Sequence, residues 1–137
     1  MAYWLMKSEP DSYAWDDLVR DGRTEWDGIH NHQAAANMRQ MAVGDRVFFS
    51  RSQKDPAVVG IMEIERAAYE DPDDPAQSYV LVDVKPVKPV ANEVSLRQIK
   101  ADPRLGHLPL VRQSRLSVSA IDDEAWAIIC GMAGVAA

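Results

Sequence analysis

The fold is decided by the stretch from residue 46 to residue 85, which reads RVFFSRSQKDPAVVGIMEIERAAYEDPDDPAQSYVLVDVK. Residues 46–51, 57–66 and 79–85 have the composition of β-strands, and valines alternate with other residues in the last of them. Turn-forming residues separate the three segments, and no helical pattern lies between them. A parallel doubly wound sheet needs a helix between successive strands, so the stretch favours a mostly antiparallel sheet.

The segments on either side complete the expected order of elements. We expect further strands at residues 2–8 and 115–119, and helices at residues 13–20, 31–41 and 96–101, with a last helix running from Asp122 to a stop at Gly131. In the first helix, Leu18 and Val19 are expected to face inward. Pro86 and Pro89 are expected to end the third strand, because proline has no N–H to donate to a neighbouring strand.

Capping residues support three of the helices. Asn31 and Asp122 are expected N-caps, because their side-chain oxygens can accept hydrogen bonds from the first free backbone N–H groups. Ser95 and Gln98 have the spacing of a capping box in front of residues 96–101.

The composition is that of a globular protein. The 137 residues are 47% hydrophobic and 26% charged, and we expect one α+β domain spanning residues 1–137. Its architecture is predicted to be a small, mostly antiparallel barrel or strongly bent sheet with helices packed outside. Cys130 is the single cysteine, so it cannot form an intrachain disulfide and is expected to be packed. The sequence shows no signal peptide and no apolar run of about 20 residues, so we expect a cytoplasmic monomer without membrane contact, cofactor or metal.

The net charge of −6 hides a segregation of charge along the chain. Residues 95–115 carry five cations and one acid, and residues 39–54 carry four cations and one acid. Residues 9–27 and 63–75 are acidic. If the two basic segments share a face, that face can hold several phosphates. The simpler interpretation is a solvated surface of mixed charge.

The most unusual stretch is residues 26–33, which reads WDGIHNHQ. An aromatic ring precedes a glycine turn and the start of a helix, and polar side chains follow it. A planar heterocycle needs such a set: a ring to stack on, worth about 1–3 kcal/mol, and hydrogen-bonding groups for its edge. Taken singly, Trp26 also fits the core and Asn31 also fits a simple cap.

Two other groups suggest chemistry more weakly. His30 and His32 could form a metal site with Glu25 or Asp27, but their spacing matches no common zinc signature. Lys7-Ser8-Glu9 has the residue types of a catalytic group, although it also fits a solvated strand end. Consecutive strand residues face opposite sides, so Ser8 is expected to point away from its two neighbours.

Several motifs together resemble one known family. They are YWLMKSEP at residues 3–10, WDGIHNHQA at 26–34, MAVGD at 41–45 followed by Phe48-Phe49, VGI at 59–61, and RQSRLS at 112–117. In this order, over essentially the whole chain, they are similar to the EVE domain. The resemblance implies a PUA-like pseudobarrel of about five or six mostly antiparallel strands with flanking helices. It also implies kinship with YTH domains, which hold a methylated adenine in an aromatic cage.

The resemblance also implies a binding site. The family's pocket residues correspond here to Lys7, Ser8, Glu9, Trp26, Gly28 and Asn31. His30 and His32 stand where many members have Arg and Tyr, and Phe49-Ser50-Arg51 replaces part of an FFYHS-like strand. We include His30, His32, Phe49 and Ser50 in the expected pocket, and Arg51, Arg112 and Arg115 as contacts to a nucleic-acid backbone.

The resulting expectation is a non-catalytic protein that binds a modified nucleobase in DNA or RNA and stacks the base on Trp26. A first alternative is a small amidohydrolase acting on modified nucleosides, with Lys7, Ser8 and Glu9 at its centre. A second alternative is an interaction module without a nucleotide ligand, which would dock through the acidic segment 63–75.

Overall fold

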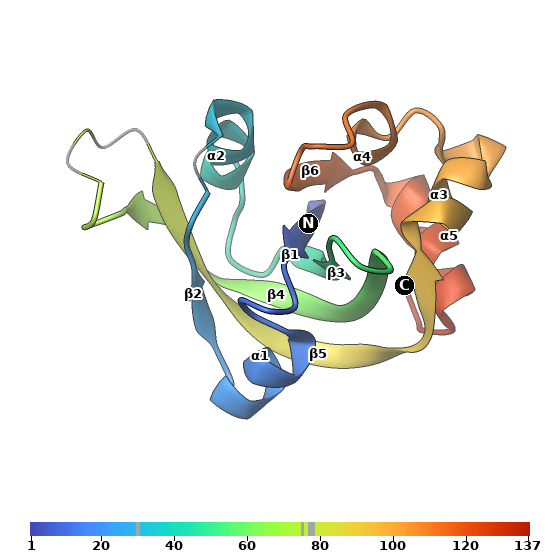
Figure 1. Cartoon of the computed structure of the whole chain (residues 1–137), viewed down its shortest axis with the longest axis horizontal. Helices are drawn as coiled ribbons and strands as arrows, with labels where there is room; N and C mark the ends of the chain where they lie inside the picture. Colours follow the sequence, from blue (N-terminus) through green and yellow to red (C-terminus); the bar gives the residue numbers. More distant parts are fainter. Residues whose placement is uncertain (30, 75, 77–78) are drawn as a thin grey trace.

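The computed structural model describes residues 1–29, 31–74, 76 and 79–137. In this part of the chain, six strands form one open sheet in the order β2-β5-β4-β3-β1-β6 (Figure 1). The strands are β1 (Tyr3–Ser8), β2 (Thr24–Trp26), β3 (Arg46–Arg51), β4 (Ala57–Glu70), β5 (Val80–Ser95) and β6 (Val118–Ile121). All neighbours pair antiparallel except β1 and β3, which run parallel. The prediction of a mostly antiparallel α+β fold is confirmed.

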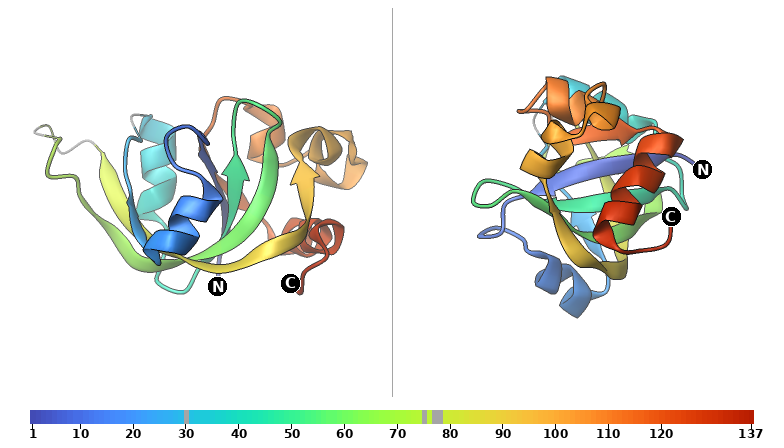
Figure 2. Two further views of the ribbon diagram at one scale, coloured as in Figure 1. Left: turned by 60° about the horizontal axis from the view of Figure 1, so that its bottom comes forward. Right: turned by 90° about the vertical axis from the view of Figure 1, so that its right-hand side faces the viewer.

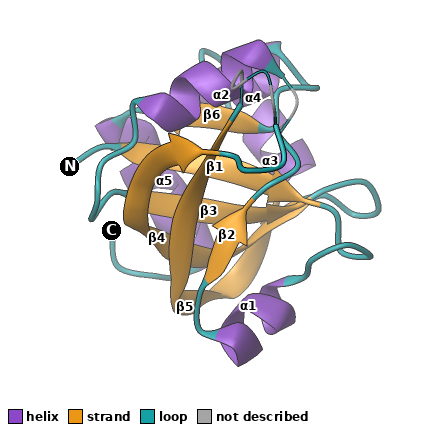
Figure 3. Cartoon of the chain, turned by 90° about the vertical axis from the view of Figure 1, so that its left-hand side faces the viewer, coloured by secondary structure: helices purple, strands orange, loops and turns teal. Residues whose placement is uncertain are grey.

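Helices pack around the sheet (Figure 3). They are α1 (Trp15–Asp21), α2 (His32–Arg39), α3 (Leu96–Ala101), η1 (Pro103–Leu105), α4 (Pro109–Arg112) and α5 (Asp123–Ala133). Asn31 caps α2, Asp122 caps α5, and Ser95 and Gln98 form the predicted capping box. Among the described residues, no helix is both long and apolar enough to cross a membrane.

The two longest strands give the sheet its strong bend. β4 and β5 curve together through the molecule (Figure 2, left), and their pairing changes register four times. The prediction that Pro86 and Pro89 end the strand is wrong, because β5 continues through both to Ser95. Both prolines pair next to register shifts. A bulge tolerates the missing N–H of proline and increases the local twist.

Two buried clusters lie on opposite faces of this sheet. Phe48 belongs to the cluster under α5, where its ring stacks on Trp126 at 3.9 Å between centroids. Phe49 belongs to the other cluster, which includes residues of α1 and α2. Adjacent strand residues point to opposite faces, so one Phe-Phe pair serves both cores.

Several expected boundaries are wrong for local reasons. Val19 is 54% exposed while Leu18 is buried, because a helix this short turns only one side inward. The last helix passes Gly131 and ends at Ala133, where Gly134 takes the left-handed conformation with φ of 72°. The final strand begins at Val118 rather than at residue 115. The short elements β2, η1 and α4 are additional to the prediction.

Candidate functional site

A cleft of about 1660 Å³ lies at one end of the strands of the sheet. β1 and β3 run parallel, with Ser8 opposite Arg51, so both strands end beside this cleft. β5 also ends there, because Ser95 pairs with Ala57 at the start of β4. The lining comes from residues 7–9, 12–13, 24–29, 51–53, 55–57, 93, 95–97, 100, 114–115 and 117. The bent sheet thereby collects segments from the whole length of the chain around one cleft.

Trp26 lines this cleft but is only 5% exposed. Its ring packs edge-on against Phe49, with centroids 5.6 Å apart, and Phe49 also contacts Trp15 edge-on. Phe49 itself is 1% exposed and lies outside the lining of the cleft. Trp26 is thus a largely buried residue that lines the cleft, and Phe49 packs against its ring.

Polar contacts before Trp26 fix the strand that carries it. Just before β2, the Arg23 guanidinium donates to the buried carboxylate of Asp83 on β5, at 2.5 Å, and pairs with Glu65 at 3.3 Å. Tyr69 donates its hydroxyl to the other oxygen of Asp83. After β2, Gly28 lines the cleft and has φ of 74°, in the left-handed region that other residues rarely adopt, so the chain can turn sharply there.

Asn31 and His32, two of the polar residues expected in the pocket, lie outside the lining of the cleft. The Asn31 side chain accepts a hydrogen bond from the Ala34 N–H, which is its capping role, and Asn31 does not line the cleft. His32 is exposed and stacks on Tyr79, also outside the lining. His30 lies outside the described residues.

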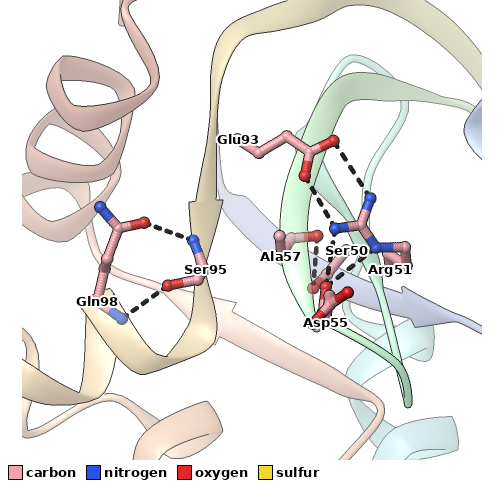
Figure 4. Close-up of polar contacts among 7 residues, drawn as sticks. All are labelled: Ser50, Arg51, Asp55, Ala57, Glu93, Ser95 and Gln98. Carbon is pink, nitrogen blue, oxygen red and sulfur yellow. Dashed lines mark hydrogen bonds and ion pairs between the residues drawn. The ribbon is translucent and has the colours of Figure 1, made fainter.

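Of the two polar residues at the end of β3, Arg51 lines the cleft and Ser50 does not. Ser50 is completely buried, and its hydroxyl donates to the Ala57 carbonyl across the base of the β3–β4 loop. Arg51 lines the cleft, and Figure 4 shows that internal partners engage its guanidinium. Nη1 and Nη2 donate to the Glu93 carboxylate, while Nε and Nη2 donate to the Asp55 carbonyl.

This Arg51 contact fixes the loop that borders the cleft. Gln53 and Asp55 have φ of 66° and 50°, which is uncommon for residues other than glycine. Arg51 joins this loop to β5 through Glu93, and the same contact holds the pKa of the Glu93 carboxyl below its usual value. Arg51 therefore shapes the cleft wall before any ligand binds.

Lys7, Ser8 and Glu9 all line the cleft. Ser8 is the last residue of β1, and the expectation that its side chain points away from Lys7 and Glu9 stays a prediction. The Ser8 hydroxyl donates to the Tyr13 carbonyl, and the Lys7 amine donates to the Ser114 carbonyl at 3.0 Å. Burial, with a smaller effect from nearby Lys100, lowers the pKa of Lys7 below its usual value.

The far side of the cleft is basic. Arg97 and Lys100 of α3 and Arg115 of the segment before β6 line it beside Lys7. We call these four residues the cationic wall. None of them has a carboxylate within ion-pair distance in the described part of the chain. The sequence-based prediction of site residues omits Arg97 and Lys100. Their spacing of three residues on a short helix in the basic segment 95–115 is the feature that could have identified them. Arg112 is exposed and does not line the cleft.

The side formed by β2 has the opposite charge. Glu25 and Asp27 flank Trp26, are exposed, and line the cleft together with Glu9. We call Glu25 and Asp27 the acidic rim. β2 and α3 lie on opposite sides of the end of β1 (Figure 1), so the cleft has an acidic side and a basic side. Within the described residues, no group of three potential metal ligands comes together.

These features place the chain among small α+β domains that have a charged cleft at the ends of a parallel strand pair. The chain belongs to the EVE domain family, whose model matches residues 2–132. Thymocyte nuclear protein 1 of Rattus norvegicus is 30% identical over 164 residues, which cover 95% of this chain and 73% of the relative. The resemblance inferred from the sequence motifs is confirmed.

Solved structures share the fold over almost the whole chain. A Rhodopseudomonas palustris protein has a TM-score of 0.92 and 43% identity, covering 98% of this chain and 94% of its own. Human thymocyte nuclear protein 1, solved in complex with DNA containing 5-methylcytosine, has a TM-score of 0.90 and 26% identity, covering 100% of both chains. A YTH domain of Zygosaccharomyces rouxii, solved with N6-methyladenosine RNA, has a TM-score of 0.61 and 18% identity, covering 96% of this chain and 85% of its own, which shows a shared fold.

Proposed function

We propose that this EVE-domain protein binds nucleic acid carrying a modified base and holds that base in the cleft beside Trp26. The observation that carries the proposal is that one cleft combines an aromatic ring, hydrogen-bonding groups and unpaired cations. The methylcytosine-containing DNA in the structure of human thymocyte nuclear protein 1 supports it, since the two chains share their fold from end to end.

The base must leave its stack to enter such a cleft. Flipping a base out of a duplex costs a few kcal/mol, so single-stranded or mismatched sites bind better. Trp26 meets the base only at the bottom of the cleft, because little of its ring is exposed. The carboxylates of the acidic rim accept hydrogen bonds, as the exocyclic amino group of cytosine or adenine requires.

Discrimination of the modification needs more than contact with the added group. Burying one methyl contributes about 0.8 kcal/mol, which is roughly fourfold in affinity. A larger preference requires the unmodified base to leave a void or an unpaired polar group. The internal contacts of Arg51 and Ser50 hold the border of the cleft in place, which favours such shape selection.

We further propose that binding occurs without catalysis. A nucleophile needs a base within hydrogen-bond reach, and the Ser8 hydroxyl is instead directed to the Tyr13 carbonyl. The Lys7 amine is likewise directed to the Ser114 carbonyl. Incubation with acylated nucleosides should leave them intact by mass spectrometry, and hydrolysis that is lost in Ser8→Ala would establish the amidohydrolase instead.

The state and location of the protein belong to the same proposal. The proposal is a monomer, in which a single chain supplies the whole binding site. The single cysteine is buried, and burial raises the pKa of its thiol, so the chain suits a reducing compartment such as the cytoplasm.

The direct test is a titration with labelled single strands. One strand carries a single 5-methylcytosine, a second carries a single N6-methyladenine, and a third is unmodified. We expect the wild type to prefer one modified strand and the variant Trp26→Leu to lose that preference. His32→Ala is the matched control, because His32 lies outside the cleft and its replacement should leave the preference unchanged. Equal affinity of the wild type for all three strands would remove the proposal.

A further inference from the structure

The cleft is larger than one base requires. Its volume of about 1660 Å³ exceeds the roughly 300–1000 Å³ of typical small-ligand pockets. The part beyond Trp26 is bordered by α3 and by the segment before β6. The structure therefore leaves room for more of a nucleotide than its base, on the side where the cations lie.

The cationic wall is a set of like charges that have no carboxylate partner among the described residues. Arg97 and Lys100 are exposed and three residues apart on α3, so they share one side of the helix. Arg115 is exposed beside them, and Lys7 is half-buried behind them, with its amine on the Ser114 carbonyl. Like charges held together are unfavourable until an anion binds between them.

The acidic rim limits where that anion can lie. Glu25 and Asp27 also have no ion-pair partner among the described residues, and they border the opposite side. A phosphate near them is repelled, whereas a phosphate near α3 is attracted. Arg51, although it lines the cleft, has its guanidinium engaged by Glu93 and Asp55.

We infer that the cationic wall binds the backbone phosphates of the strand whose base enters beside Trp26. The strand then passes over α3 and the segment before β6, and not over β2 or Arg112. The inference rests on the proposed function, because the base fixes which end of the cleft the strand enters. It replaces Arg51 and Arg112 of the sequence-based prediction with Lys7, Arg97 and Lys100, and it retains Arg115.

Salt dependence measures these contacts directly. The probe is a single strand with one 5-methylcytosine, titrated from low to high salt against the wild type and the double variant Arg97→Gln/Lys100→Gln. Each lost phosphate contact lowers the slope of log affinity against log salt by about 0.7, so the double variant should lose about 1.4 and bind about tenfold more weakly at low salt. Arg112→Gln is the matched control for an exposed cation outside the cleft and should keep the wild-type slope. A double variant that keeps the wild-type slope, or a control that loses as much, overturns the inference.

A strand of the same sequence with an abasic site separates this inference from the proposed function. If the wild type prefers the modified strand but the double variant keeps the wild-type slope, the inferred phosphate site is wrong and the proposed function stands. If modified and abasic strands bind equally and the double variant weakens both, the function fails and the wall stands as a phosphate site. Absence of binding to either strand overturns both.

Discussion

Two groups of cations in this protein differ in what they contact. Arg23, Arg46, Arg51 and Arg104 each pair with a carboxylate, at distances from 2.5 to 3.2 Å. The four members of the cationic wall have no such partner in the described residues, and they line one side of one cleft. Position rather than net charge therefore decides where an acidic chain can hold a phosphate.

The two groups of cations also have different roles: the paired arginines stabilise local structure, and the members of the cationic wall do not. An exposed ion pair contributes about 0–1 kcal/mol to stability, so the paired arginines matter chiefly for the loops and strands they hold. Arg23 fixes the chain just before Trp26, and Arg51 fixes the β3–β4 loop. The members of the cationic wall have no carboxylate partner in the described residues, although the Lys7 amine donates to the Ser114 carbonyl, so their charges remain available to a ligand.

The largest effect on binding affinity is expected at Trp26, which lies between the acidic rim and the cationic wall. Trp26→Leu removes the surface on which a base can pack, and base–aromatic stacking contributes about 1–3 kcal/mol. Affinity for the preferred modified strand should fall about tenfold or more, by fluorescence anisotropy. Affinity for an abasic strand should be unchanged, which also controls for folding, because Trp26 is buried. An equal loss on both strands would mean that the variant has lost its structure and not a base contact.

The paired group is tested next at Arg51. Arg51→Gln and Glu93→Gln each release the β3–β4 loop from β5, and each should weaken binding of the modified strand about threefold. Because both remove the contact between Arg51 and Glu93, the double variant should be no worse than Arg51→Gln, which also loses the contact with the Asp55 carbonyl. The salt slope should stay at the wild-type value in all three. A slope lowered only in Arg51→Gln would place Arg51 among the phosphate ligands and break the division into two groups.

Arg104 provides a smaller test of the same division. It pairs with Asp102 at 2.7 Å and lies near α3, but it does not line the cleft. Arg104→Gln should change affinity by less than about twofold and leave the salt slope unaltered. A loss as large as that of Lys100→Gln would show that general charge near α3, and not the wall, attracts the strand.

The smallest effect concerns the protonation of Lys7. Lys100→Gln removes one of the two causes that lower the pKa of Lys7, so this pKa should move toward its ordinary value of 10.5, as followed by NMR titration of the lysine side chain. The pKa of Lys7 is lower in the folded protein than in the unfolded chain. At pH values between the folded-state pKa and 10.5, the unfolded chain therefore binds more protons, and the stability of the folded protein rises with pH. The rise should be smaller in Lys100→Gln. An unchanged Lys7 pKa would show that the two amines do not interact.

Much of the fold was accessible from local pattern. Ser95 and Gln98 define a helix start within four residues, and Phe48 and Phe49 belong to a strand whose two faces are both buried. The prolines of β5 misled the prediction because their tolerance depends on register shifts against β4, which are properties of the pair and not of one strand. β2 has three residues, too few to show a period.

The site was predictable only in part for a related reason. The motif around Trp26 is contiguous, so its residue types and their spacing are enough to identify it. The cationic wall combines β1, α3 and the segment before β6. The pairing of β1 with β6 and the pairing of β5 with β4 bring these segments to the same cleft. Whether a cation is free also depends on distant partners, as with Arg51 and Glu93, which are 42 residues apart.

One measurement tests the central claim most directly: the changes in the NMR spectrum of the labelled protein when a single strand with one 5-methylcytosine is added. The account predicts that the indole N–H of Trp26 and the amides of α3 shift together. The indole of Trp4, held by Asp45, and that of Trp126, stacked between Tyr3 and Phe48, should stay in place. Shifts that spare Trp26 and α3 and gather on another surface would contradict it.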